Sequence, residues 1–341
     1  MASLESSRPA TAVRNSNGSL MTRHPPPSQV CNGPRALADR LPAHLTAELA
    51  RDFDVRYCTG SDRQELLVAV SQASALLVRS ATRVDQEVFD AAPLLQVVAR
   101  AGVGLDNVDV EAATRAAVTV ANAPYSNVVS VAELTVGLII ALARLFLSAS
   151  ASVHEGQWRR ADFQGVELAG RTAGILGLGK VGELVAARLR AFGMRVLTHD
   201  PHVRADALQR TGAHAVSLKE LLRESDVRTV HVPLTDATRN LIGERELSWV
   251  KPSLHLVNTA RGGIVNKFAL AQALKEGRSA GAALDVFEFE PPVSSPLLGL
   301  AMVIATPHIG AGTAQAQERA GREAIRAVRQ VLTGSTPDRV G

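Results

Sequence analysis

The sequence predicts an α/β protein of two domains, each built on a parallel β-sheet wrapped by helices. Short apolar runs alternate with helical patterns in both halves of the chain, which is typical of such sheets. The length of 341 residues is sufficient for two hydrophobic cores. A glycine-rich turn also lies midway along the chain, where an apolar run passes into a helical pattern.

The composition argues against several classes of protein. The two cysteines, Cys31 and Cys58, are too far apart in sequence for a zinc motif and too few for a disulfide framework. We therefore expect no metal and a reducing, cytoplasmic location. The net charge of +4 could attract nucleic acid, but the arginines are scattered and aromatic residues make up only 4%. No nucleic-acid partner is therefore expected.

Two segments bear on targeting and membranes. Residues 1–33 are rich in Ser, Asn, Pro and Arg without an apolar core, which predicts a disordered extension and no signal peptide. The longest apolar stretch, Leu134–Leu147, is too short to span a bilayer and contains Arg144. It is expected to be a buried helix that begins at a capping box of Ser130 and Glu133, with no membrane partner.

Apolar runs bounded by turn residues give the expected strands. In the first half they lie near Pro34–Asp39 and at Val55–Cys58, Ala75–Val78, Gln96–Ala99 and Val118–Ala121. In the second half they are Thr172–Leu176, Arg195–Thr198, Thr229–Val232, Leu254–Val257, Ala282–Val286 and Met302–Ala305. A final helix over Thr313–Leu332 would return the chain to the first domain. The predicted domains are therefore residues 34–122 with 308–341, and an inserted domain over 123–307.

The glycine-rich turn carries the first functional prediction. Gly177, Gly179 and Gly182 follow the predicted strand Thr172–Leu176, and Asp200 ends the next one. In a dinucleotide fold, such glycines allow the tight turn, the approach of pyrophosphate and the packing of helix on strand. Asp200 would accept hydrogen bonds from the ribose and repel a 2'-phosphate, which favours NAD over NADP. The alternative is a purely structural turn.

Three polar segments follow later strands of the inserted domain. They contain Arg261, then Asp285 with two glutamates, then His308. Because ligands bind at the carboxyl ends of parallel strands, all three should face the cofactor. Arginine can hold a carboxylate through paired hydrogen bonds, and histidine can transfer a proton near neutral pH beside an orienting carboxylate. From the residues alone, Glu288 and Glu290 are equal candidates for that carboxylate.

These motifs resemble the D-isomer-specific 2-hydroxyacid dehydrogenases, and within them the bacterial phosphoglycerate dehydrogenases. The resemblance includes Leu77–Thr82, Val98–Asp109, Asn122–Asn127, the glycine-rich turn and the three polar segments. It implies two Rossmann-like or flavodoxin-like domains, a homodimer, and NAD-dependent oxidation of a CH–OH group. It also implies Arg261 as the substrate carboxylate ligand, His308 as the acid–base and Glu290 as its partner.

The resemblance further implies two sets of binding residues. Those for the cofactor are Gly177, Gly179, Lys180, Val181, Gly182, Asp200, His231, Pro233, Thr259, Ala260, Asp285 and His308. Those for the substrate are Arg79, Ser80, Gly102, Val103, Gly104, Asn127 and Arg261. Arg79 matches a residue that binds the substrate phosphate, so a small phosphate- or phosphonate-bearing substrate is expected.

Some positions depart from the family pattern. Asn266-Lys267-Phe268 replaces the usual Asp-Glu pair, and Arg228 occupies a normally aliphatic strand position. The chain ends at Gly341, from which we expect a short form without a C-terminal regulatory domain. Two alternatives stay open: a phosphonate dehydrogenase or reductase of specialised metabolism, acting on phosphonopyruvate or a phosphonate alcohol or aldehyde, and an NADH-sensing protein similar to corepressors.

Overall fold

The computed structural model describes residues 13–14, 20–21, 35–37, 39–253 and 255–335. The chain divides into two compact units, unit 1 (Met1–Ser126 with Gln317–Gly341) and unit 2 (Asn127–Ala316). Within the predicted N-terminal extension, the described residues are β1 (Val13–Arg14) and β2 (Leu20–Met21), which pair antiparallel. The rest of that predicted extension lies outside the described residues.

Unit 1 contains a parallel sheet with the strand order β4-β3-β5-β6-β7. Its strands are β3 (Arg35–Leu37), β4 (Val55–Tyr57), β5 (Ala75–Val78), β6 (Val97–Arg100) and β7 (Thr119–Ala121). Its helices are α1 (Ala43–Leu49), α2 (Arg63–Val70), α3 (Gln86–Asp90), α4 (Val110–Arg115) and most of α12 (Ala314–Leu332). This strand order is that of flavodoxin-like domains, as the sequence predicts.

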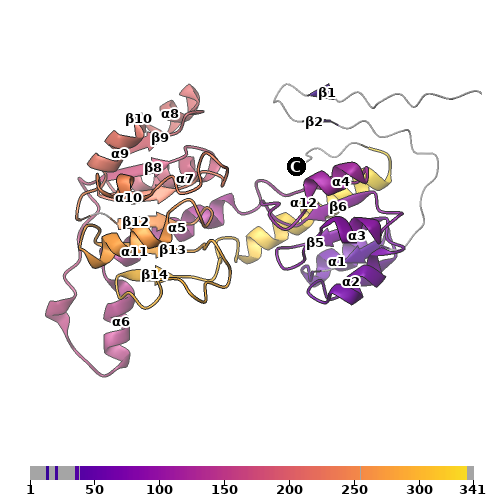
Figure 1. The fold of residues 1–341 in the computed structure, drawn as a ribbon, viewed down its shortest axis with the longest axis horizontal. Helices are drawn as coiled ribbons and strands as arrows, with labels where there is room; N and C mark the ends of the chain where they lie inside the picture. Colours follow the sequence, from indigo (N-terminus) through magenta and orange to yellow (C-terminus); the bar gives the residue numbers. More distant parts are fainter. Residues whose placement is uncertain (1–12, 15–19, 22–34, 38, 254, 336–341) are drawn as a thin grey trace, which may run out of the picture. The chain divides into compact units, whose positions relative to one another are not determined.

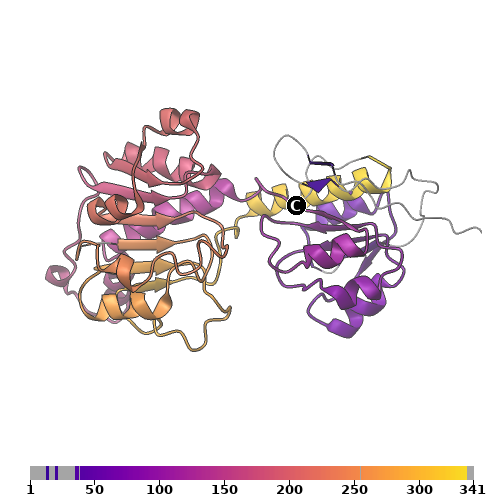
Figure 2. The same ribbon diagram turned by 45° about the horizontal axis from the view of Figure 1, so that its top comes forward.

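Both faces of the unit 1 sheet are covered. Leu66, Val88 and Ala112 of α2, α3 and α4 belong to one buried cluster, together with alternate residues of β5 and β6. On the opposite face, Leu45 of α1 and Ile325 of α12 pack against the other residues of the same strands. The last helix therefore returns to unit 1 as predicted, and Figure 2 shows it lying along this sheet.

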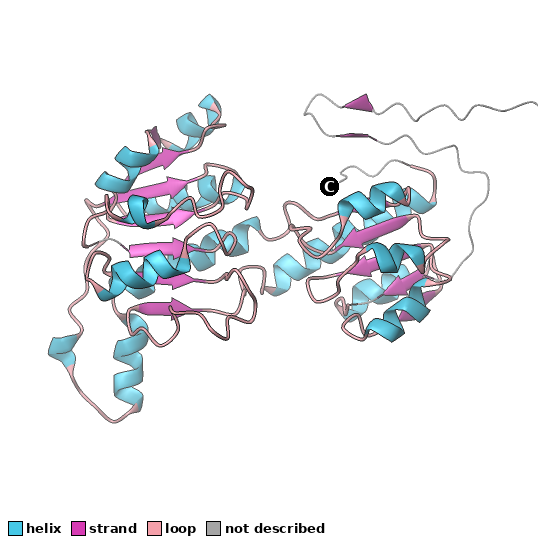
Figure 3. Ribbon diagram, viewed as in Figure 1, coloured by secondary structure: helices cyan, strands magenta, loops and turns pink. Residues whose placement is uncertain are grey.

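Unit 2 contains a parallel sheet with the strand order β10-β9-β8-β11-β12-β13-β14. The strands are β8 (Thr172–Leu176), β9 (Arg195–His199), β10 (His214–Ala215), β11 (Val227–Val230), β12 (His255–Asn258), β13 (Gly281–Leu284) and β14 (Val303–Ala305). The helices are α5 (Val128–Ala143), α6 (Phe146–His154), α7 (Lys180–Ala191), α8 (Ala205–Thr211), α9 (Leu218–Glu224), α10 (Glu244–Leu247) and α11 (Lys267–Lys275), with a 3-10 turn at Arg160–Asp162. Figures 1 and 3 show helices on both faces of the sheet, with α5 and α7 on one face and α11 on the other. This is the doubly wound order of a Rossmann domain, again as predicted.

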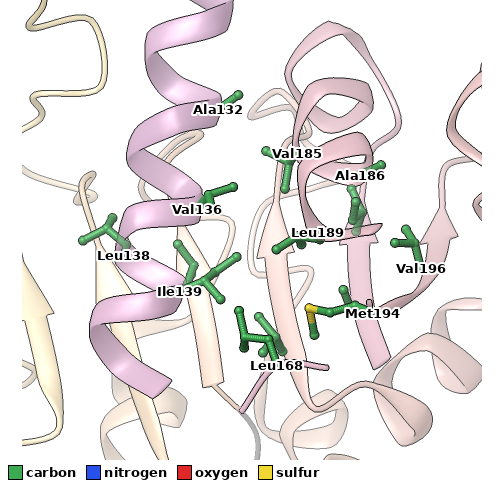
Figure 4. Close-up of a cluster of buried hydrophobic side chains, with 14 of the residues drawn as sticks. Ala132, Val136, Leu138, Ile139, Leu168, Val185, Ala186, Leu189, Met194 and Val196 are labelled. Carbon is green, nitrogen blue, oxygen red and sulfur yellow. The ribbon is translucent and has the colours of Figure 1, made fainter. Parts of the chain in front are cut away.

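Helix α5 forms a large part of the unit 2 core. Val136 and Ile139 pack in one buried cluster with Val185 and Leu189 of α7 (Figure 4). The side chain of Ile139 is fully buried. The prediction that this apolar helix is buried is therefore confirmed for α5. No single described helix is long and apolar enough to cross a membrane, although the bent pair α5 and α6 meets that test by length and composition.

The structure corrects several details of the predicted elements. The capping box was wrong, because Ser130 lies inside α5, whose N-cap is Asn127. The stretch Leu134–Leu147 is not one helix: it breaks at Leu145, which has a φ of 51° and precedes α6. β11 begins and ends two residues earlier than expected, which leaves His231 in the following loop. The two-residue edge strand β10 was not predicted, since so short a strand has no periodicity to detect.

Arg228 in β11 has a fully buried, positively charged side chain. Its side chain is 0% exposed, and its Nη2 donates to the Leu222 carbonyl oxygen at 2.8 Å. Nε and Nη1 have no hydrogen-bond partner among the described residues. Burial lowers the pKa of this guanidinium from 12.5 to about 9. The folded state is therefore penalised by a buried, unpaired charge at every pH below about 9.

We predict that Arg228→Met stabilises the protein at pH 7. An apolar side chain of similar size removes the desolvation penalty, and replacing buried ionic groups in this way contributes about 1–4 kcal/mol. Denaturant unfolding of the full chain, followed by circular dichroism, measures the difference in unfolding free energy between the variant and the wild type. The control is Arg223→Met, which changes an exposed arginine of α9. A lower unfolding free energy in Arg228→Met than in the control would contradict the prediction.

Candidate functional site

The glycine-rich turn connects β8 to α7, as the sequence predicts. Gly177 has a φ of 89°, and a Cβ there would lie 2.8 Å from the carbonyl oxygen of His231. A Cβ at Gly182 would lie 2.2 Å from the Gly177 carbonyl oxygen, so α7 packs directly on the turn. At Gly179, by contrast, a Cβ would meet open space. Two of the glycines are therefore required by the fold, and the third leaves room beside the N-terminus of α7 for a phosphate group.

Asp200 follows β9 and stabilises the glycine-rich turn through hydrogen bonds. Its Oδ2 accepts a hydrogen bond from the Leu178 amide at 2.9 Å, and its Oδ1 accepts one from the His202 amide at 2.8 Å. Each carboxylate oxygen can still accept a further bond. The turn lies between β8 and β11, where the strand order of the sheet reverses. Ligands of doubly wound sheets bind at such a switch point, so these residues fit a dinucleotide.

The other predicted cofactor residues lie at the carboxyl ends of the same strands. Lys180 and Val181 open α7, while His231 and Pro233 follow β11. The His231 Nε2 lies 2.9 Å from the Thr229 hydroxyl, and burial lowers the pKa of this imidazole to about 3. His231 is therefore neutral at physiological pH.

The segment after β12 is held from two sides. The Thr259 hydroxyl contacts that of Thr135 on α5 at 2.8 Å, and the Ala260 amide donates to the Asn258 side chain at 3.0 Å. The Asn258 amide group in turn donates to the Arg261 carbonyl oxygen at 2.8 Å. These bonds fix the backbone from which the Arg261 side chain projects.

Asp285, at the end of β13, is completely buried and organises the next loop. Its Oδ1 accepts hydrogen bonds from the Thr306 hydroxyl at 2.6 Å and from the Ile309 amide at 2.8 Å. Its Oδ2 accepts one from the Gly310 amide at 2.8 Å. These donors flank His308, which has a φ of 52°, a conformation that is costly for a residue with a Cβ. The Asp285 carboxylate therefore fixes the turn that carries His308.

His308 and Glu290 are paired in the structure. The His308 Nδ1 lies 2.7 Å from Glu290 Oε2, and the Phe287 amide donates to Glu290 Oε1 at 3.0 Å. Glu288 points elsewhere: its Oε2 is 2.8 Å from the Lys267 amine. The structure thus shows that Glu290, and not Glu288, contacts His308, a choice that the residues alone left open. With Nδ1 committed to the carboxylate, Nε2 is the ring nitrogen left for a proton transfer.

The segments that carry Arg261 and Glu290 touch through their backbones. A Cβ at Gly262 would lie 1.9 Å from the Phe287 carbonyl carbon, so only glycine permits this approach. The Arg261 guanidinium is partly buried, and its Nη1 donates to the Ala260 carbonyl oxygen at 2.7 Å. Among the residues described, no group of three His, Cys, Asp or Glu side chains could hold a metal ion.

Arg79 lies in unit 1, directly after β5. Its amide donates to the Asp39 carboxylate, and its carbonyl oxygen accepts a bond from the Asn107 side chain at 2.7 Å. Its guanidinium is partly exposed, with one long contact of 3.5 Å to the Arg40 carbonyl oxygen. β5 and β3 flank the point where the unit 1 strand order reverses. Arg79 is therefore placed where a sheet of this kind binds its ligand.

The other substrate residues predicted in unit 1 lie at strand ends near Arg79, whereas Asn127 lies in unit 2. Ser80 is exposed beside Arg79, and the loop Ala101–Gly104 follows the neighbouring strand β6. That loop is tied down by the Asn122 side chain, which donates to the Val103 carbonyl oxygen at 2.7 Å. Asn127 belongs to unit 2, where it is the N-cap residue of α5.

The structure also reveals supporting residues that the sequence did not single out. Asp39 and Asn107 hold the Arg79 backbone, and Thr306 completes the bonds to Asp285. Asn107 lies within the motif Val98–Asp109, so its presence could have been noticed. The sequence could not show that Asn107 bonds Arg79 and Thr82, because those residues follow a different strand, β5.

Comparison with known proteins identifies the family. Residues 136–310 match the family model of the D-isomer specific 2-hydroxyacid dehydrogenase NAD binding domain. The D-3-phosphoglycerate dehydrogenase of Mycobacterium tuberculosis is 48% identical over 305 residues, which cover 89% of this chain and 58% of that protein. The enzyme of the same name from Methanocaldococcus jannaschii is 45% identical over 288 residues, 84% of this chain and 55% of its own. The chain thus spans about half the length of the curated relatives it matches.

Solved structures agree with this assignment. A protein of Thermus thermophilus aligns with a TM-score of 0.83 at 35% identity, over 89% of this chain and 98% of its own. D-lactate dehydrogenase from Aquifex aeolicus, complexed with NAD and lactic acid, aligns with a TM-score of 0.78 at 29% identity, over 88% and 95%. The chain therefore belongs to the D-isomer-specific 2-hydroxyacid dehydrogenase family, with the family's NAD-binding domain in unit 2.

Proposed function

We propose that this protein is an NAD-dependent dehydrogenase of the phosphoglycerate dehydrogenase type. Its substrate is a small, phosphate-bearing 2-hydroxy acid, whose CH–OH group it oxidises, or the corresponding 2-oxo acid, which it reduces. The main support is the contact of 2.7 Å between His308 and Glu290 at the carboxyl end of the unit 2 sheet. The relatives named D-3-phosphoglycerate dehydrogenase support the substrate class.

His308 acts as the acid–base in this proposal. In the oxidative direction its Nε2 takes the proton of the substrate hydroxyl, while Nδ1 keeps its hydrogen bond to Glu290. The carboxylate of Glu290 stabilises the imidazolium that forms and fixes the orientation of the ring. In the reductive direction the same imidazolium returns the proton to the carbonyl oxygen.

Arg261 and the glycine-rich turn position the two reactants. The Arg261 guanidinium binds the substrate carboxylate through paired hydrogen bonds and so orients C2. Gly177, Gly179, Lys180, Val181, Gly182 and Asp200 bind the diphosphate and ribose, and His231, Pro233, Thr259, Ala260 and Asp285 line the same strand ends. NAD, when bound, supplies the hydride acceptor.

Arg79 provides the charge that selects the substrate. A dianionic group needs fixed cations and hydrogen-bond donors, and Arg79 lies at a switch point beside the loop Ala101–Gly104. Ser80, Gly102, Val103 and Gly104 of unit 1 are the neighbouring polar or backbone ligands in this proposal, and Asn127 of unit 2 is a further substrate ligand. A phosphonate carries the same charge as a phosphate ester, so phosphonate substrates belong to the same proposal.

The functional form is proposed to be a cytoplasmic homodimer. In Figure 1, α6 projects away from the rest of unit 2. Phe146 of this helix is 61% exposed and Trp158 after it is 83% exposed, and such side chains are suited to a subunit contact. A second copy would cover them, and a monomeric mass by light scattering would refute this part of the proposal.

The first functional prediction is that His308→Ala lowers kcat about 10²–10⁴-fold, the usual contribution of general acid–base catalysis. NADH binding, measured by fluorescence, should stay near wild type. His214→Ala, which changes an exposed histidine at the edge of the unit 2 sheet, is the control. Normal turnover in His308→Ala would remove this residue from the mechanism. NADH binding by the wild type without turnover of any 2-oxo acid would instead favour the cofactor-sensing alternative.

The second functional prediction concerns cofactor choice. The wild type should prefer NAD(H) strongly, because the Asp200 carboxylate repels a 2'-phosphate. Asp200→Asn keeps an acceptor for the turn but removes the charge, so the ratio of kcat/KM values for NADH and NADPH should fall. Asp206→Asn, on the exposed face of α8, should leave the ratio unchanged. Equal efficiency of the wild type with both cofactors would show that Asp200 does not contact the ribose.

The third functional prediction is that Arg79→Ala lowers kcat/KM for phosphorylated or phosphonylated substrates at least about tenfold, since each charge-assisted bond contributes about 1.5–3 kcal/mol. Activity on glycerate or hydroxypyruvate should hardly change. Arg83→Ala, a more exposed arginine of the same loop, is the control. The substrates to compare are 3-phosphoglycerate, 3-phosphohydroxypyruvate, phosphonopyruvate and small phosphonate alcohols and aldehydes. Preference of the wild type for glycerate over all of these would refute the anion site.

A further inference from the structure

The segment that carries Glu290 has little support beneath it. From Glu288 to Glu290 the side chains are exposed, and Phe289 is 71% exposed. A cavity of about 410 Å³ lies against this segment and is lined by residues of 262–270 and 284–297. The bond from the Phe287 amide to Glu290 is local, and the close approach of Gly262 reaches only the backbone of Phe287 and Glu288. The position of the Glu290 carboxylate therefore depends on some further contact.

Lys267 makes that contact from a rigid element. It is the first residue of α11, which is anchored by the buried side chains of Leu270 and Leu274 and is capped by Asn266. The Lys267 amine lies 2.8 Å from Glu288 Oε2 and 5.1 Å from the centre of the Phe289 ring. It thus binds, by an ion pair and a cation–π contact, the two residues that directly precede Glu290.

The stability of α11 does not explain a lysine at this position. The N-terminus of a helix carries partial positive charge, which disfavours a cation in the first turn. The first turn of α11 contains no acidic residue, and Asn266 already caps two of its amides. The ammonium of Lys267 is instead compensated by Glu288 and the neighbouring aromatic rings. This position is also where the sequence departs from the usual Asp-Glu pair of the family.

We propose that Lys267 is a positioning residue, which holds the segment Phe287–Glu290 so that the Glu290 carboxylate stays against the His308 imidazole. This inference rests on the acid–base function proposed for His308 and Glu290. Lys267 itself contacts neither reactant and acts through Glu288 and Phe289. Loss of Lys267 would loosen the carboxylate and leave the imidazolium less stabilised.

The test compares Lys267→Met, Lys267→Arg and Glu288→Gln in the full chain, with Lys275→Met at the other end of α11 as the control. A partly exposed ion pair of this kind makes a modest contribution. Lys267→Met should therefore lower kcat for 2-oxo acid reduction by up to about fivefold, with little change in KM. The high-pH limb of the profile should move to lower pH by up to about 0.7 unit, because the acid form of His308 is less stabilised.

Three further comparisons identify the cause. Lys267→Arg, which can pair with a carboxylate and stack on a ring, should restore most of the profile. The double variant Lys267→Met/Glu288→Gln should lose little more than Lys267→Met alone, because both changes break one interaction. A wild-type profile in Lys267→Met, or an equal shift in Lys275→Met, would overturn the proposal.

A readout without turnover separates this inference from the proposed function. The imidazole of His308 can be titrated by NMR, with its signal assigned from the spectrum of His308→Ala. Its titration midpoint should fall in Lys267→Met and recover in Lys267→Arg, whatever reaction the protein catalyses. An unchanged midpoint in Lys267→Met would refute the positioning function even if wild-type dehydrogenase activity were present.

Discussion

The buried carboxylate of Asp285 is the interaction on which the acid–base end of unit 2 depends. It is 0% exposed and accepts three hydrogen bonds, from Thr306, Ile309 and Gly310. A carboxylate without such donors would be expensive to bury, so the loop after β14 must keep its amides directed at it. That requirement sets the position of His308 between them and sustains its left-handed backbone.

Both sheets place their proposed ligand-binding residues at the same kind of position. Each has one point where the strand order reverses, between β8 and β11 in unit 2 and between β3 and β5 in unit 1. Adjacent loops diverge at such a point and leave backbone amides accessible. The glycine-rich turn occupies the first point and Arg79 the second, which gives one position suited to a dinucleotide and one suited to an anion.

Some polar groups lie where stability alone would not place them. Arg228 adds to the core of unit 2 a charge that has no ion pair among the described residues, and nothing in the structure explains its retention. Lys267 also opposes the dipole of its own helix, but it holds the exposed residues next to Glu290. The difference between the two cases is that Lys267 has partners whose position matters to the proposed chemistry.

The sequence alone determined the fold class, most strands and the order of the polar segments. Those properties follow from local patterns: buried parallel strands give continuous apolar runs, and the turn after β8 requires glycine at positions 177 and 182. Resemblance to a known family added functions for Arg261, Glu290 and His308 that spacing could not supply. Only the tertiary structure showed that Glu290 contacts His308 while Glu288 contacts Lys267. It also showed that the Asp39 carboxylate accepts a hydrogen bond from the Arg79 amide and that the apolar stretch is interrupted at Leu145. These contacts join residues from separate strands and loops, and no local period of the sequence encodes which side chains meet across a sheet edge.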